Sequence, residues 1–201
     1  KCHHNDLSDY IETNLIPSNK SENYSFLKRT DEFTTEILCD HNYFYFTSYL
    51  DENKICDVIQ FALNHNNAEE VKIVIYFLLL MVKKIESKYF KGGLIKEIKI
   101  PSSIISIEND AFNDCALLEK VIIPSSVTFI GQNAFTKCKN LVKINIPSSV
   151  KTIGNDAFSE CVSLTEIEIP SSVTSIGANL FNRCLELKHV SMPISMTEYV
   201  V

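Results

Sequence analysis

The stretch that decides the fold is INIPSSVKTIGNDAFSECVSLTEIEIPSSVTSIGANLF, which runs from Ile144 to Phe181. Its two halves carry the same pattern of Ile-Pro-Ser-Ser-Val, then Ile-Gly, then a phenylalanine. The second copy begins 23 residues after the first. A pattern that recurs at a fixed interval of about 20 to 50 residues indicates a stack of similar structural units rather than one closed core.

The pattern extends on both sides of this stretch, from about Leu94 onward. Four kinds of residue recur there with the same step. Because four columns share one period, they predict four full repeats and a partial fifth. The columns are Pro101, Pro124, Pro147, Pro170 and Pro193; Ile107, Ile130, Ile153 and Ile176; Phe112, Phe135, Phe158 and Phe181; and Cys115, Cys138, Cys161 and Cys184.

Each column has an expected physical role. Alternating apolar residues such as Ile144 and Ile146 predict a short strand with one buried face. Proline ends the strand because it has no N–H to donate, and the serine pair turns the chain. Glycine, as at Gly154, is expected to permit a backbone bend that other residues cannot make. Asp156 and its equivalents are expected to be N-caps of a single helical turn.

One such unit cannot bury its own apolar side, so successive units are expected to stack. The sequence therefore predicts an α/β solenoid of 23-residue coils, with short parallel strands and an internal row each of phenylalanine and cysteine. The cysteines are expected to be buried as small hydrophobes rather than in disulfides, because equivalent side chains in a stack point in parallel directions. The total of seven cysteines is odd, so at least one thiol lies outside any intrachain pair.

The repeat IPSSVTSIGANLFNRCLEL, from Ile169, and its three relatives resemble the BspA-type leucine-rich repeat. The resemblance covers about Leu94 to Val201. It implies a recognition module with no catalytic residues, since members of that family are found in bacteria and protists, often as surface antigens implicated in adhesion. The chain departs from the family pattern at Glu108 (for Gly), Leu180 (for Ala), Ile104 and Met196 (for Val), and Gly92, where a preceding cysteine would fall.

Residues 1–92 lack the repeat and are expected to form a mainly α-helical region, followed by the solenoid over residues 93–201. Apolar residues at helical spacing predict one helix near Ile55 and Ile59, and a longer one over residues 67–90 that Gly92 and Gly93 end. The expected role of this region is to cover the open N-terminal end of the solenoid. An independent binding domain is the alternative.

Several function classes find no support in the sequence. The net charge of −6 and the absence of a basic patch argue against nucleic-acid binding. The longest apolar run, Ile73 to Val82, has ten residues, whereas a spanning helix needs roughly 20. No nucleophile elbow or phosphate loop occurs, and the cysteines and histidines at Cys2, His3, His4, Cys39 and His41 match no zinc motif. We therefore expect no enzyme activity, no cofactor and no metal.

Residues that point outward between the buried strand positions are the candidate partner-binding face. They vary along the array where the core positions do not, which suits recognition and also plain solvent exposure. Its two apolar members, Ile122 and Phe129, are expected to form a small apolar patch if both point outward. The candidates are Lys99, Lys120, Ile122, Phe129, Lys143, Asn145, Glu166 and Glu168.

These features predict a non-catalytic protein–protein interaction module. The family resemblance implies a surface adhesin or antigen, and an intracellular scaffold or structural component of a larger assembly is the alternative. Acceptor patterns for glycosylation at Asn19 and Asn23 favour the cell surface or secretion, whereas free cysteines favour a reducing cytoplasm. The incomplete fifth repeat suggests self-association through the C-terminal end of the solenoid.

Overall fold

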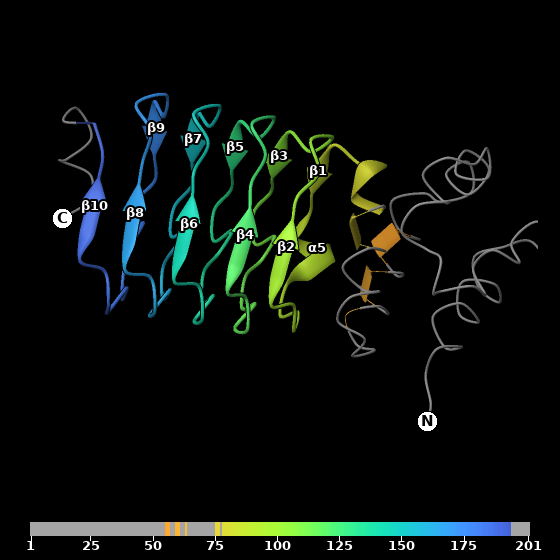
Figure 1. Cartoon of the computed structure of the whole chain (residues 1–201), viewed down its shortest axis with the longest axis horizontal. Coiled ribbons are helices and arrows are strands. Elements are labelled where there is room, and N and C mark those ends of the chain that lie inside the picture. The colour runs from red at the N-terminus through yellow and green to blue at the C-terminus, as the bar shows by residue number, and fades with distance from the viewer. Residues whose placement is uncertain (1–54, 57–58, 61–62, 64–74, 77, 194–201) are drawn as a thin grey trace, which may run out of the picture. The chain divides into compact units, whose positions relative to one another are not determined.

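The chain forms two compact units, Lys1–Leu78 and Leu79–Val201. The computed structural model describes residues 55–56, 59–60, 63, 75–76 and 78–193. The second unit contains all the described strands, which lie side by side in a regular row (Figure 1). In the first unit, residues 55–56, 59–60, 63 and 75–76 and Leu78 are helical, in agreement with the helical spacing of the sequence there. The expectation that residues 1–92 cap the solenoid stays a prediction.

Two strands alternate in each coil of the second unit and build two separate parallel faces. One face is a five-stranded sheet in the order β1-β3-β5-β7-β9, and every strand has two residues. Residues that pair between neighbouring strands of this sheet are 23 positions apart in the sequence, except between β1 and β3, where they are 22 apart. The strands are β1 Lys84–Ile85, β3 Ser106–Ile107, β5 Phe129–Ile130, β7 Thr152–Ile153 and β9 Ser175–Ile176.

The other face consists of three-residue strands in which the middle residue points inward. It has two parts, because β2 pairs with β4, and β6 pairs with β8 and β10, while β4 and β6 share no strand pairing. The strands are β2 Glu97–Lys99, β4 Lys120–Ile122, β6 Lys143–Asn145, β8 Glu166–Glu168 and β10 His189–Ser191. We call this second face the strand face.

The phenylalanines form a single internal row, which confirms the central prediction from the sequence. Phe112, Phe135 and Phe158 are completely buried. Their rings are nearly parallel, with centroids 5.2 Å apart between Phe112 and Phe135 and 5.7 Å apart between Phe135 and Phe158. Phe181 continues the row at 6.1 Å and is half-buried. Stacked coils therefore share one continuous core.

Side chains also join each coil to the one before it through hydrogen bonds to backbone carbonyls. The thiol of Cys138 donates to the carbonyl oxygen of Phe112 at 3.2 Å, and the other three cysteines of the repeats make the equivalent contact. The second serine of each turn does the same, as where Ser149 donates to Val127 at 2.6 Å. The carbonyls that accept the thiols also accept a backbone N–H, as that of Phe112 does from Cys115 at 3.1 Å, so the thiols add a second bond between coils.

The repeat glycines have a different role from the one expected. None of Gly131, Gly154 and Gly177 has a positive φ, so no special bend requires them. A Cβ added to Gly154 would instead lie 2.4 Å from the backbone nitrogen of Gln132 in the preceding coil. Glycine is needed here because two coils approach each other closely. Its N–H donates to the carbonyl of Ile130 at 2.8 Å across the same contact.

The expected single helical turn after each Asp or Asn was wrong. Residues 109–114 form successive turns, and Asp110 has a φ of 59°, whereas an N-cap residue has extended backbone. Asp and Asn tolerate this left-handed conformation better than most residues, which explains their column. The array is therefore a β-solenoid of about five turns with little helix, rather than the α/β solenoid expected.

The long helix expected over residues 67–90 was also wrong in its second half. The helical residues end at Leu80, and the chain then forms β1 and the short helix α5 (Ser87–Phe90). Ile85 pairs with Ile107, and the ring of Phe90 stacks on Phe112 at 4.9 Å. Ile85 and Phe90 therefore extend the isoleucine and phenylalanine rows by one rung. Burial in these rows outweighs the helical pattern of the local sequence.

Candidate functional site

The strand face carries seven of the eight candidate residues. Lys99, Lys120, Ile122, Lys143, Asn145, Glu166 and Glu168 all lie on β2, β4, β6 or β8, and all are exposed. Each strand has the burial pattern exposed, buried, exposed. Parallel pairing in register aligns these residues in two rows, because residues 23 apart lie opposite one another.

Phe129, the eighth candidate, lies elsewhere. It is the first residue of β5 in the five-stranded sheet and is half-buried. Ile122 is on β4 and therefore on the other face of the coil. The two residues do not form one apolar patch on the strand face.

Val142 is a member of the strand face that the sequence did not single out. Its side chain is 50% exposed, and that of Ile122 is 44% exposed. Val142 precedes β6, so both residues border the junction at which β4 and β6 are unpaired. The sequence does mark Val142 as unusual, because the other residues of its column are polar: Lys96, Glu119, Thr165 and Lys188.

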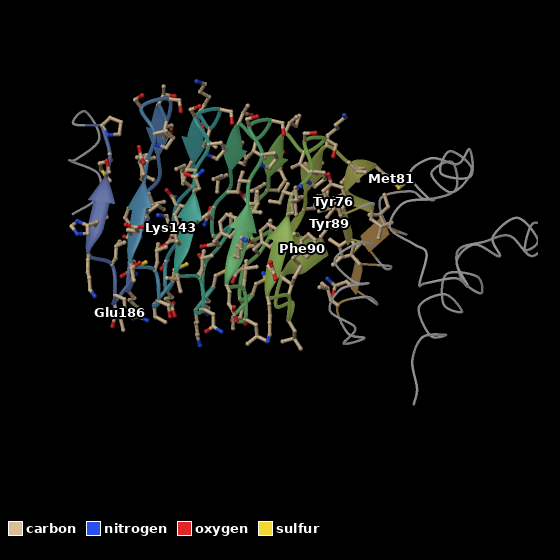
Figure 2. All side chains as sticks on the ribbon, in the orientation of Figure 1. Tyr76, Met81, Tyr89, Phe90, Lys143 and Glu186 are labelled. Carbon is tan, nitrogen blue, oxygen red and sulfur yellow. The ribbon has the colours of Figure 1, made fainter. Side chains whose placement is uncertain are left out.

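An ion pair crosses the strand face between β6 and β8. The Nζ atom of Lys143 lies 2.5 Å from Oε1 of Glu166 (Figure 2 labels Lys143). This hydrogen bond raises the pKa of Lys143 and lowers the pKa of Glu166. Both side chains remain well exposed, so the pair fixes local orientation and contributes little to stability.

The buried thiols are chemically protected. Burial raises the pKa of Cys115 to about 12 and that of Cys184 to about 11, and it raises those of Cys138 and Cys161 well above their ordinary value. A thiol reacts as its thiolate, so these groups are inert at neutral pH. All five cysteines among the described residues are free.

The described part of the chain contains no group of three or more His, Cys, Asp and Glu side chains arranged to hold a metal ion. Within the same residues, no helix combines the length and the apolar character that crossing a membrane requires.

Comparison with known proteins agrees with this architecture. Residues 83–199 match the family model "BspA type Leucine rich repeat region" with six copies. The chain is a leucine-rich-repeat solenoid, and it belongs to the BspA-type leucine-rich repeat family. No curated protein is significantly similar to it. The match begins ten residues before the expected solenoid boundary, in agreement with the position of β1.

Three solved structures illustrate the likeness. A leucine-rich repeat protein of Bacteroides ovatus is 42% identical over 57% of this chain and 30% of its own, with a TM-score of 0.54. The leucine-rich repeat protein of T. pallidum is 36% identical over 57% of this chain and 54% of its own, with a TM-score of 0.55. A leucine-rich cell surface protein of Faecalibacterium prausnitzii is 34% identical over 56% of this chain and 31% of its own, with a TM-score of 0.52. The chain thus matches less than two thirds of the length of each.

Proposed function

We propose that this protein is a non-catalytic protein-binding module that recognises its partner through the strand face. The observation that carries the proposal is the aligned exposure of variable residues on five parallel strands. Leucine-rich repeat proteins are typically binding modules of this kind. Extended ladders of this type supply a large contact surface without a pocket.

The centre of the proposed interface is Ile122, together with Val142. Both side chains are exposed and aliphatic; Ile122 pairs in register with Lys99, and Lys143 follows Val142 in the chain. Apolar residues at the centre of a polar rim are the usual arrangement of a binding hot spot. The rim would set orientation and association rate more than affinity.

The test is a binding assay with a partner captured by cross-linking to the wild-type chain and then purified. Ile122→Glu should weaken binding of this partner by about tenfold or more, because a carboxylate replaces an apolar side chain that the partner would bury. Ile105→Glu is the matched control, since Ile105 is 51% exposed but lies outside the strand face. Equal binding by wild type and Ile122→Glu would contradict the proposal.

We place this module at the cell surface, as an adhesin or antigen. The support is the 34% identity to the leucine-rich cell surface protein of Faecalibacterium prausnitzii. The free thiols are no argument for the alternative of an intracellular scaffold, because burial protects the four cysteines of the repeats. An antibody against the chain should stain intact cells of its source; staining only after permeabilisation would favour the scaffold.

Self-association through the last coil is a further part of the proposal. Val190 is 38% exposed, whereas Ile144 and Ile167 in the same inward column are 3% and 4% exposed. A second copy of the chain would cover the side chain of Val190 through a symmetric contact. Sedimentation equilibrium should show a dimer that Val190→Glu dissociates, and a monomeric wild type at high concentration would exclude it.

A further inference from the structure

The outer side of the five-stranded sheet differs in chemistry from the strand face. We define the hydroxyl face as three rows of residues that lie on this sheet or directly border it, on the side away from the core. Each row has one residue per coil, and all twelve are exposed or half-buried. The rows are Ile105, Thr128, Lys151 and Thr174; Ser106, Phe129, Thr152 and Ser175; and Asn109, Gln132, Asn155 and Ala178.

The hydroxyl face carries few charges. Lys151 is the one charged residue among these twelve, and the coil of β1 adds Lys83 and Lys84 at the equivalent positions of the same sheet. The chain as a whole has 44 charged side chains, 19 basic and 25 acidic. Three rows of the strand face, which begin at Lys96, Glu97 and Lys99 and recur every 23 residues, hold nine charged residues among fifteen. Those nine are Lys96, Glu97, Lys99, Glu119, Lys120, Lys143, Glu166, Glu168 and Lys188. An uncharged surface on an acidic protein suits an uncharged partner, which would leave no ion desolvated and unpaired.

Hydrogen-bonding groups on this face are held in fixed orientations by the preceding or following coil. The hydroxyls of Thr128 and Thr174 donate to the carbonyls of Ile105 and Lys151, each at 3.3 Å, which leaves their oxygen lone pairs as acceptors. Such groups need no further ordering when a ligand binds, so less entropy is lost.

The asparagines of the third row supply donors. The Oδ1 atoms of Asn109 and Asn155 accept the backbone N–H groups of Gln132 and Ala178, each at 2.8 Å. Their amide NH₂ groups remain as donors. The two threonines lie two coils apart, as do the two asparagines, so each kind of group repeats in every second coil, at about 9.6 Å or twice the strand spacing of about 4.8 Å.

Phe129 provides the aromatic element of the face. Its strand neighbours in register are Ser106 and Thr152, so small hydroxyl residues flank the half-buried ring on both sides. An aromatic ring contacts C–H groups of a ligand with its face while the neighbouring hydroxyls bind polar groups. Apolar area is otherwise limited to Ile105 and Ala178, which is little for the apolar core of a protein interface.

We propose that the hydroxyl face binds a neutral polysaccharide chain. Sugar hydroxyls match the fixed donors and acceptors, and sugar C–H groups match the ring of Phe129. None of the twelve residues is acidic, and the carboxylate that borders them, on half-buried Glu108, already accepts the hydroxyl of Ser106 at 2.7 Å. Each contact is individually weak because it replaces a hydrogen bond to water. Affinity should therefore rise with the number of sugar units that span successive coils.

The test is affinity electrophoresis in native gels that contain dextran, laminarin or glucomannan, with polygalacturonate as a charged polysaccharide. The wild-type chain should be retarded by at least one neutral polymer and not by polygalacturonate. Phe129→Ser, which removes the ring, should weaken this binding by about tenfold. Because Phe129 is half-buried, the double variant Thr128→Glu with Thr174→Glu serves as a second test at fully accessible positions.

Asn145→Glu on the strand face is the matched control and should leave retardation unchanged. Retardation by none of the three neutral polymers would overturn the proposal, as would equal retardation of wild type and the double glutamate variant. If Phe129→Ser instead abolished binding of a captured protein, the face would be a protein-binding surface and the proposal would be wrong. These outcomes do not depend on the result for Ile122→Glu. Protein binding by the strand face and polysaccharide binding by the hydroxyl face can therefore be contradicted separately.

Discussion

At the level of single residues, each cysteine of the repeats combines two functions. Its side chain is completely buried in Cys115, Cys138 and Cys161 and half-buried in Cys184, and its thiol donates to the preceding coil, as Cys138 does to Phe112. The sequence predicts the burial correctly, because the column has the repeat period. It does not predict the hydrogen bond, since a donor role depends on where the neighbouring carbonyl lies.

The buried thiols should make the array sensitive to alkaline pH. Burial raises the pKa of Cys115 from 9.0, the ordinary value of an exposed thiol, to about 12. The protonated thiol thus stabilises the fold fully below about pH 8.5, and this contribution is lost as the pH rises toward 12. Denaturant unfolding at pH 7.5, 9 and 10 should show a falling free energy of unfolding, by up to about 1.4 kcal/mol per pH unit for each thiol.

The variant Cys115→Ala should be less stable than wild type at neutral pH and should lose less free energy of unfolding between pH 8.5 and 10. Comparison of the two chains removes the titration of tyrosines and lysines, which is common to both. Identical pH slopes for wild type and variant would show that the thiol of Cys115 is accessible to water.

The glycine columns give a second prediction at this scale. Gly154→Ala should lower the free energy of unfolding by about 2 to 3 kcal/mol, because the new Cβ would lie 2.4 Å from the backbone of the preceding coil. Gly92→Ala is the matched control: a Cβ added to Gly92 would have no heavy atom of a neighbouring residue within 4 Å, and only the φ of 71° opposes a side chain. That strain costs about 1 kcal/mol. Chemical denaturation should therefore rank Gly154→Ala as the more destabilising, and the reverse order would contradict close coil contact.

At the level of elements, the turns between strands carry the backbone strain of the array. Asp110, Asn133, Asp156 and Asn179 occupy one left-handed column, and Asp114, Lys137, Glu160 and Arg183 occupy another. The first column is readable from the sequence because Asp and Asn favour this conformation. The second column has no common side-chain chemistry, so it could not be predicted from the sequence. Its cause is the geometry of a tight turn repeated in every coil.

This strain leads to a prediction at Lys137, whose φ is 63°. Lys137→Gly should raise the free energy of unfolding by about 0.5 to 1 kcal/mol, because glycine adopts the left-handed conformation without a steric penalty. Lys139 is exposed and has no positive φ, so Lys139→Gly should instead lower stability. Thermal unfolding of the two variants beside wild type checks the opposite signs. A loss of stability in both would show that the strain is relieved in some other way.

The elements at the N-terminal edge show why a local pattern can mislead. Residues 67–90 have helical hydrophobic spacing, yet β1 and α5 interrupt them because Ile85 and Phe90 fit the rows of the next coil. The five-residue step from Ile85 to Phe90 equals that from Ile107 to Phe112 and was visible in the sequence. The 23-residue period does not reach this coil, because Ile85 lies 22 residues before Ile107.

At the level of the whole solenoid, its two faces divide the surface chemistry between them. The strand face holds exposed aliphatic side chains among charges, and the hydroxyl face holds one aromatic ring among neutral polar groups. The sequence predicted the rows of the strand face by their period. It misplaced Phe129, because assignment of an outward residue to one sheet or the other depends on where the chain turns after Pro124.

The central claim is that consecutive coils are hydrogen-bonded to each other through the Ile and Gly columns. Scalar couplings across hydrogen bonds, measured by NMR on the isotopically labelled chain, test it directly. We expect correlations from the amide nitrogens of Gly131, Gly154 and Gly177 to the carbonyl carbons of Ile107, Ile130 and Ile153, whose oxygens lie 2.8 Å from those nitrogens. Correlations to carbonyls four residues earlier, or none from amides that exchange rapidly with solvent, would contradict the stacked solenoid.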